Sequence, residues 1–274
     1  MRWQAAGAIV ILTGVSSGIG RELCRLLVQR GAIVVANARR QDRLNALQQS
    51  LATAPAGRSP STAGQLHTVA GDVTDPAVRA ALVAQAEQLG QGRLDLLVNN
   101  AGIGALGPFQ QASESRLRRI MEVNFFAPVE LARAALPLLQ RGRHPVLCNI
   151  GSVLGHRAVP NKSEYCASKF ALHGWSDALR AELRPCGIQV TLVSPSTTRS
   201  EFFDAVIDTP QGTTSRSLGS WPPERVARAT LAAIAARRSE VILSWGGKAL
   251  VYADRLAPSL VNFAVAERGR PGDA

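Results

Sequence analysis

Short apolar segments alternate with longer amphipathic stretches along most of this chain, and that alternation is the strongest constraint on its fold. Seven segments have the composition of buried strands: 8–12, 32–36, 65–70, 94–98, 145–150, 188–193 and 240–244. Helical patterns lie between them, among them 18–30, 75–89, 114–140 and 163–184. Strands that alternate with helices form a parallel sheet with helices on both faces. We therefore expect an α/β fold with a doubly wound, parallel, seven-stranded sheet, in a single domain because 274 residues with 46% hydrophobic composition suit one core.

The turn after the first predicted strand reads TGVSSGIG over residues 13–20 and leads directly into the first predicted helix. Gly14 allows a tight turn there, Gly18 lets the backbone approach a pyrophosphate, and Gly20 lets helix and strand pack closely. The helix N-terminus offers free N–H groups and a positive dipole end to phosphates. The turn predicts a Rossmann-type dinucleotide site at the carboxyl edge of the sheet.

The end of the second predicted strand indicates which dinucleotide binds. An NAD-dependent enzyme places an acidic residue here to accept hydrogen bonds from the ribose 2′-hydroxyl, whereas this chain has Ala38, Arg39 and Arg40. A carboxylate repels a 2′-phosphate, while a guanidinium binds it through two hydrogen bonds and stacks beside adenine. We predict NADP(H) as the cofactor, with Arg39 as the principal reader of the phosphate and Arg40 as its helper.

The stretch SEYCASKF at 163–170 holds one of the two tyrosines of the chain and, four residues later, a lysine. That spacing puts Tyr165 and Lys169 on the same face of a helix, within reach of a shared ligand. A core tyrosine beside a surface lysine would have the same spacing. The surrounding motifs therefore decide between the two interpretations.

With these motifs the chain resembles the short-chain dehydrogenase/reductase family over nearly its whole length, to about residue 245. The resemblance is carried by TGVSSGIG at 13, DV at 72, NNAG at 99, Asn124, Ser152 and YCASK at 165. It implies an NADP(H)-dependent oxidoreductase that transfers hydride between nicotinamide and a small-molecule carbonyl or secondary alcohol. It also implies a homodimer or homotetramer, formed through the fourth and fifth helices.

The family pattern implies catalytic roles for Asn124, Ser152, Tyr165 and Lys169. Tyr165 would be the general acid and base, Ser152 would hold the substrate oxygen, and Lys169 would also bind the nicotinamide ribose. Asn124 would organise a water that relays protons from Lys169. A phenol with a pKa of about 10 is a poor base near neutrality. An ammonium roughly 5 Å away contributes about 3 kcal/mol toward the phenolate, or roughly two pKa units, so we expect a lowered pKa at Tyr165.

The resemblance implies further cofactor contacts besides Tyr165 and Lys169. In the phosphate turn these are Ser16, Ser17 and Ile19, and at the adenine site they are Asp72 and Val73. The floor of the cofactor site after the fourth strand would be formed by Asn99, Ala101 and Gly102. The loop after the sixth strand would contribute Pro195, Thr198 and Ser200. The last group departs from the family pattern, which reads Pro-Gly with a threonine five positions after the proline. Serine stands at 200 here, and Thr198 could take its place.

We expect two parts in the chain. Residues 1–246 form the NADP-binding catalytic domain, with a substrate lid over about 196–222, and 247–274 form a C-terminal helical extension and tail. The lid combines turn residues with apolar ones, which indicates an apolar substrate: Phe202, Phe203, Val206 and Ile207.

The segment 249–266 in the tail has apolar residues at helical spacing, interrupted by polar residues and by Pro258. It cannot span a bilayer. We expect it to pack on the core or on a second subunit, and attachment to a membrane surface is the alternative.

Composition excludes other function classes. The net charge of +11 comes from arginines in scattered small groups without a nucleic-acid-binding motif, so we expect no nucleic-acid partner. The cysteines at 24, 148, 166 and 186 show no metal-type spacing with the four histidines, so we expect free thiols and no metal. The N-terminal apolar run is too short for a signal peptide, which favours a cytoplasmic protein.

His156 lies in the loop after Ser152, where we expect it to face solvent, with a substrate contact as the alternative.

Two other functions compete with the dehydrogenase interpretation. Sugar-nucleotide epimerases and dehydratases share the fold, but they usually show Gly-x-x-Gly-x-x-Gly and a separate C-terminal substrate region. A regulatory protein that binds NADPH without turnover often lacks catalytic residues, whereas all four are present here.

Overall fold

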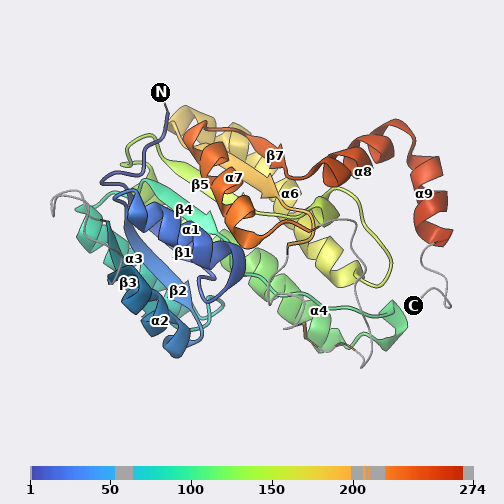
Figure 1. The fold of residues 1–274 in the computed structure, drawn as a ribbon, viewed down its shortest axis with the longest axis horizontal. Helices are drawn as coiled ribbons and strands as arrows, with labels where there is room; N and C mark the ends of the chain where they lie inside the picture. Colours follow the sequence, from blue (N-terminus) through green and yellow to red (C-terminus); the bar gives the residue numbers. More distant parts are fainter. Residues whose placement is uncertain (1, 53–63, 199–205, 208, 210–219, 268–274) are drawn as a thin grey trace.

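The computed structural model describes residues 2–52, 64–198, 206–207, 209 and 220–267. Its centre is the expected seven-stranded parallel sheet, in the order β3-β2-β1-β4-β5-β6-β7 (Figure 1). The strands are β1 (Ile9–Thr13), β2 (Ile33–Ala38), β3 (Gln65–Ala70), β4 (Leu96–Asn99), β5 (Val146–Ile150), β6 (Gln189–Ser194) and β7 (Glu240–Ile242). The strand order reverses between β1 and β4, and the loops that follow such strands form the usual ligand crevice.

Two groups of helices cover the two faces of the sheet, each over its own apolar core. One group consists of α1 (Gly18–Gln29), α2 (Gln41–Ala52) and α7 (Pro223–Ala235), and the other of α3 (Pro76–Gly90), α5 (Ala127–Leu139) and α6 (Ser163–Leu183). Successive residues of β1 alternate between the cores, because side chains on a strand point to opposite faces. The predicted fold class is confirmed.

The region predicted as one helix over 114–140 contains three segments. They are α4 (Glu114–Met121), the π-helix η3 (Glu122–Phe126) and α5. Pro128 has no N–H group, so the α-helical hydrogen bond to the carbonyl of Asn124 cannot form, and the helix widens there. The widened turn carries one of the predicted catalytic residues.

The C-terminal segment forms α8 (Trp245–Leu256) and α9 (Pro258–Glu267), which extend away from the sheet (Figure 1). Val251 of α8 packs on Val153 and Ile242. α9 lies against α8 and accepts a hydrogen bond at Asn262 from Arg157, at 2.7 Å. Within the described ranges, no helix is long and apolar enough to cross a membrane.

Three short turns complete the described chain: the 3-10 helices η2 (Phe109–Gln111), η4 (Val153–Gly155) and η5 (Arg184–Cys186). The four cysteines are free thiols, as expected, and of these only Cys186 is exposed.

Candidate active site

The glycine turn joins β1 to α1 and has a backbone that only glycine adopts easily. Gly14 and Gly18 have φ values of 74° and 57°. A Cβ on Gly14 would lie 2.8 Å from the Cα of Ala101, so the turn packs directly on the segment after β4. In the described chain the side chain of the N-cap Ser17 makes no capping hydrogen bond, and the first turn of α1 has no acidic residue. The N–H groups at this end are therefore suited to a phosphate, which fits a dinucleotide.

Asn100, a residue within the NNAG motif that sequence reasoning did not single out, supports the turn. Its Nδ2 donates to the carbonyl oxygens of Thr13 at 2.9 Å and Gly14 at 3.0 Å. The Thr13 hydroxyl accepts the N–H groups of Asn100 at 3.1 Å and Ala101 at 3.0 Å. These bonds fasten the predicted cofactor floor at Ala101 and Gly102 to the phosphate turn.

Arg40, of the two predicted phosphate readers, is the one that contacts the turn. Its guanidinium donates to the Ser16 hydroxyl at 3.2 Å. Arg39, the residue directly after β2, is exposed. Arg40 therefore contacts the glycine turn, and Arg39 follows β2 at the carboxyl edge of the sheet.

Asp72 follows β3 closely and is held in place. It accepts hydrogen bonds from the Thr74 N–H at 3.0 Å, from the Thr74 hydroxyl at 2.8 Å, and from the Arg119 guanidinium of α4. Burial alone would raise the pKa of Asp72, but these hydrogen bonds and the charge of Arg119 outweigh it, so the pKa lies below its usual value. Its neighbour Val73 is buried in the core under α3.

Tyr165 and Ser152 come together from two different elements. Ser152 follows β5 and caps η4, accepting the Leu154 N–H at 3.1 Å, and its hydroxyl also hydrogen-bonds the Tyr165 phenol of α6. Burial raises the pKa of Tyr165 to about 12, although the bond to Ser152 lowers it. The pKa of Tyr165 is therefore raised and not lowered as expected, because desolvation of the phenol outweighs its hydrogen bond to Ser152.

Lys169 lies one turn after Tyr165 on the same face of α6, as its spacing predicts. Its Nζ lies 5.8 Å from the centroid of the Tyr165 ring and donates to the carbonyl oxygen of Ile150 at 3.0 Å. The residue is only 5% exposed. Burial lowers the pKa of the amine to about 8, so charged and neutral forms differ little in free energy near neutrality.

Asn124 uses its side chain to join two segments. Its Oδ1 accepts the Ile103 N–H at 2.9 Å, and its Nδ2 donates to the Ile103 carbonyl and to the Ser168 hydroxyl, each at 3.0 Å. These contacts hold the segment after β4 against α6. They give Asn124 a positioning role, in addition to the water contact expected of it.

Asn99 points into the core rather than to the cofactor floor. Its Nδ2 donates to Asn149 Oδ1 at 2.9 Å and to the Pro128 carbonyl at 3.4 Å. Its side chain therefore lies away from the crevice, and the predicted cofactor contact would be limited to its backbone.

The loop after β6 approaches the site through Pro195, whose carbonyl oxygen accepts the Val153 N–H at 2.9 Å. Thr198 is buried and forms an isolated bridge with Trp221. The predicted contact at Ser200 lies outside the described residues, and so does most of the predicted lid. The described residues of the lid are 196–198, 206–207, 209 and 220–222.

Arg116 and Glu164 form a buried ion pair beside the site. Nε and a terminal nitrogen of the guanidinium lie 3.1 and 2.7 Å from Glu164 Oε1, and the two side chains are 1% and 5% exposed. The pair joins α4 to the first turn of α6, directly before Tyr165. The sequence around Arg116 does not reveal this pair, because a buried partner 48 residues away leaves no local pattern.

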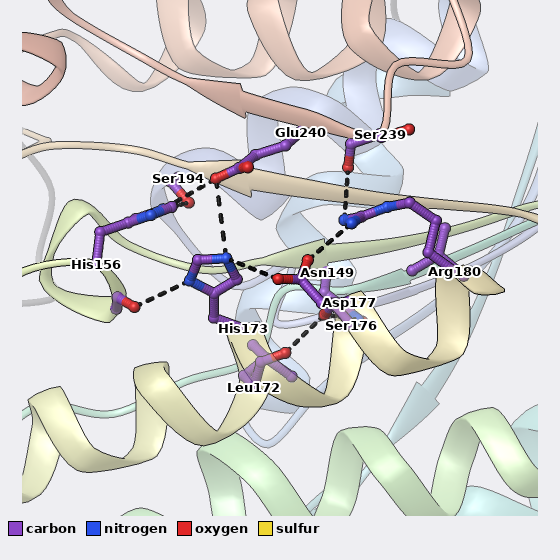
Figure 2. A network of polar contacts seen from close by, with 12 residues as sticks. Asn149, His156, Leu172, His173, Ser176, Asp177, Arg180, Ser194, Ser239 and Glu240 are labelled. Atoms are coloured by element: carbon purple, nitrogen blue, oxygen red, sulfur yellow. Dashed lines mark hydrogen bonds and ion pairs between the residues drawn. The ribbon is translucent and has the colours of Figure 1, made fainter. Parts of the chain in front are cut away.

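His156 faces neither solvent nor the crevice, contrary to expectation. Figure 2 shows its ring between Ser194, Glu240 and His173. Its side chain is 2% exposed, and its Nε2 lies 2.9 Å from Ser194 Oγ. The loop after Ser152 therefore turns inward at this residue.

Comparisons with known proteins agree with this geometry. The sequence profile of the family described as short chain dehydrogenase matches residues 8–211. A dehydrogenase/reductase SDR family member 7B from Bos taurus is 35% identical over 98% of this chain and 84% of its own length. A 3-ketodihydrosphingosine reductase from Bacteroides thetaiotaomicron is 33% identical over 72% of this chain and 66% of its own length. A short chain dehydrogenase/reductase from Burkholderia phymatum, solved in complex with NAD, has a TM-score of 0.82 at 24% identity, with 94% of this chain and 96% of that chain covered.

Proposed function

Since the chain belongs to the short-chain dehydrogenase/reductase family of NAD(P)-dependent oxidoreductases that act on CH–OH groups, we propose that it uses NADP(H) to interconvert an apolar carbonyl compound and its secondary alcohol. The observation that carries the proposal is the hydrogen bond between the Ser152 and Tyr165 hydroxyls, with Lys169 on the next turn of α6. The three side chains lie on the carboxyl side of the sheet, where the glycine turn also opens.

The bound nicotinamide supplies or accepts the hydride. In carbonyl reduction, Tyr165 donates its phenolic proton to the substrate oxygen while Ser152 hydrogen-bonds the same oxygen. Burial holds the phenol in its protonated form at neutral pH, which suits a proton donor. In alcohol oxidation the proton passes the other way, from the substrate hydroxyl to the phenolate oxygen of Tyr165, and a charged Lys169 stabilises that phenolate.

The preference for NADP(H) rests on Arg40 and Arg39. Arg40 lies against the phosphate turn through Ser16, and Arg39 adds a second positive charge at the end of β2. Two guanidinium groups suit a 2′-phosphate better than a 2′-hydroxyl.

An apolar substrate is supported by Ile207, a residue of the predicted lid. It packs on a small apolar cluster: Ile103, Ala105, Ile120 and Val123. The Bacteroides relative is named for the reduction of a keto compound, 3-ketodihydrosphingosine, in line with a carbonyl substrate.

We propose a homo-oligomer for the assembly. Leu117 of α4 and Phe126, the last residue of η3 before α5, are 40% and 47% exposed, and the family resemblance assigns the fourth and fifth helices to subunit contacts. We retain residues 1–246 as the catalytic domain and 247–274 as an extension, since α8 and α9 add no strand to the sheet.

A substrate panel tests the proposed activity. Ketones, aldehydes and secondary alcohols of increasing chain length are offered to the purified chain with NADPH or NADH, and cofactor absorbance is followed. We expect turnover of apolar carbonyl compounds with NADPH. Tyr165→Phe should lose roughly 10²-fold or more in kcat and still bind NADPH, because only the transferable proton is removed.

The chain offers a matched control, since Tyr252 is its other tyrosine and lies half-exposed on α8. Tyr252→Phe should keep full activity. Tight NADPH binding without turnover of any compound would instead support a regulatory binding protein, and undiminished activity in Tyr165→Phe would remove the role proposed for Tyr165.

A further inference from the structure

We propose that His156, His173 and Glu240, with Asp177 as a fourth ligand, form a binding site for one divalent transition-metal ion, with Zn²⁺ as the best fit. One ligand atom from each of the first three residues lies within 4.8 Å of those from the other two. Figure 2 shows that they come from three separate segments: the loop at η4, helix α6 and the start of β7. The site lies apart from the glycine turn and serves no step of the hydride transfer.

The distances between the nitrogen and oxygen atoms are those of a slightly open tetrahedron. Glu240 Oε1 lies 3.3 Å from His156 Nε2 and 4.0 Å from His173 Nε2, while Asp177 Oδ2 lies 3.4 Å from His173 Nε2. Zinc bonds of about 2.0–2.1 Å at tetrahedral angles require ligand atoms roughly 3.3 Å apart. Small side-chain movements would therefore complete the coordination.

The hydrogen bonds of His173 orient it as a ligand. Its Nδ1 lies 3.0 Å from the Gly155 carbonyl oxygen, which can only accept, so Nδ1 carries the proton. The lone pair of the neutral ring is then on Nε2, the atom that faces both carboxylates. A carbonyl behind a histidine is the usual second partner of a metal-bound imidazole.

Arg180 orients Asp177 through Oδ1, the carboxylate oxygen that does not face His173. The guanidinium lies 2.7 Å from Asp177 Oδ1 and also donates to the Ser239 carbonyl at 3.1 Å (Figure 2). Only Oδ2 is left to face His173. The fourth ligand is thus held by a contact outside the metal site.

Glu240 and His156 each have one buried polar atom that makes no hydrogen bond in the described part of the chain. Among the described residues, neither Glu240 Oε1 nor His156 Nδ1 accepts or donates a hydrogen bond, and both atoms are buried. The buried Glu240 oxygen faces the Nε2 atoms of two imidazoles, and a divalent cation bound there would give it a positive partner.

The Ser194 hydroxyl is compatible with this arrangement. It lies 2.9 Å from His156 Nε2. A hydroxyl rotates freely, so when a metal takes the Nε2 lone pair it can donate to a carboxylate instead. Glu240 is 29% exposed on its side chain and His173 17%, which leaves an entry path for the ion.

A metal here would connect the segment of Ser152 to the helix of Tyr165. His156 lies four residues after Ser152, and His173 lies four residues after Lys169 on α6. An ion that binds only the folded chain raises its stability by mass action. We therefore expect a structural ion that stiffens the back of the proposed active site.

Metal binding to the full chain tests the site. Protein treated with EDTA and dialysed is titrated with Zn²⁺ alone, and bound metal is measured after equilibrium dialysis. We expect one equivalent per chain, a higher Tm with Zn²⁺, and a Co²⁺ absorption spectrum of tetrahedral nitrogen and oxygen ligands. Glu240→Gln and His173→Gln should each weaken binding at least roughly tenfold. Circular dichroism in EDTA establishes that each variant is folded.

Two controls separate this site from others. His67→Gln removes a histidine on β3, and Cys186→Ser removes the exposed thiol, and neither should change the stoichiometry. The proposal is overturned if the parent binds no Zn²⁺, if folded Glu240→Gln and His173→Gln bind as the parent does, or if the Co²⁺ spectrum shows thiolate ligands.

Discussion

The Lys169 amine donates a hydrogen bond to the main-chain carbonyl oxygen of Ile150, the last residue of β5, at 3.0 Å. This bond fixes the buried amine to the sheet directly before Ser152. Lys169 is therefore held between the strand that leads to Ser152 and the helix turn that carries Tyr165. Its titration should be visible in the stability of the whole chain.

Lys169→Met should change how stability depends on pH. In the unfolded chain the amine keeps its proton to about pH 10.5, whereas burial lowers the folded pKa to about 8. Between these values the unfolded state binds more protons, so the free energy of unfolding contributed by Lys169 rises with pH. The difference in free energy of unfolding, parent minus Lys169→Met, should therefore increase from about pH 8 to 10.5 in urea titrations.

Lys248→Met controls for the loss of one positive charge, because Lys248 lies over the Trp245 ring on α8, away from the site. A parent-minus-Lys169→Met difference that stays flat across this range would contradict the assigned burial of the amine.

Cofactor choice should depend on both arginines at the end of β2. Arg40→Ala and Arg39→Ala should each lower kcat/KM for NADPH by roughly 10- to 100-fold, because each variant removes a hydrogen bond between two charged groups. The same variants should leave kcat/KM for NADH nearly unchanged, since NADH has no 2′-phosphate. Steady-state kinetics with both cofactors measures the ratio, and an equal loss for both would argue against phosphate recognition.

Glycine at position 20 should be irreplaceable, in contrast to another helical glycine. A Cβ at Gly20 would lie 2.2 Å from the Gly14 carbonyl oxygen and 2.4 Å from Asn100 Nδ2. Gly20→Ala should thus distort the phosphate turn and weaken NADPH binding, as measured by fluorescence titration. Gly174→Ala on α6, where an added Cβ has nothing within 4 Å, should raise stability by about 0.5–1 kcal/mol and leave binding intact.

The buried ion pair of Arg116 and Glu164 should show strong coupling. Arg116→Met leaves the Glu164 carboxylate buried without its partner and should cost about 3–5 kcal/mol of unfolding free energy. The double variant Arg116→Met/Glu164→Leu removes both charges and should recover much of that loss. Urea denaturation of all four proteins gives the coupling energy, and additive losses would mean that the pair contributes no mutual stabilisation.

Several features of the molecule follow from short stretches of sequence. The glycine pattern after β1 predicts the turn because φ values above zero are a local property of glycine. The spacing of Tyr165 and Lys169 predicts a shared face because helix geometry repeats locally. The apolar segments predict the seven strands of the sheet, and no predicted boundary differs from the observed one by more than two residues.

Other features depend on contacts between segments distant in the sequence. Asn124, Asn100 and Arg116 reach partners on other elements, and nothing in their immediate sequence identifies those partners. The pKa of Tyr165 has the same origin. The spacing reveals a neighbouring amine, but the surrounding protein determines how much water the phenol loses, and that desolvation raises its pKa.

The chain's own order of residues thus determined the strands and helices, the phosphate turn and the pairing of Tyr165 with Lys169 on α6, since each depends on the residue pattern of a short stretch. Only the tertiary structure decided the burial of those side chains and the meeting of His156, His173 and Glu240 from three segments. Burial and long-range contact depend on how the whole chain packs, because solvent access at one residue is set by residues far from it in sequence.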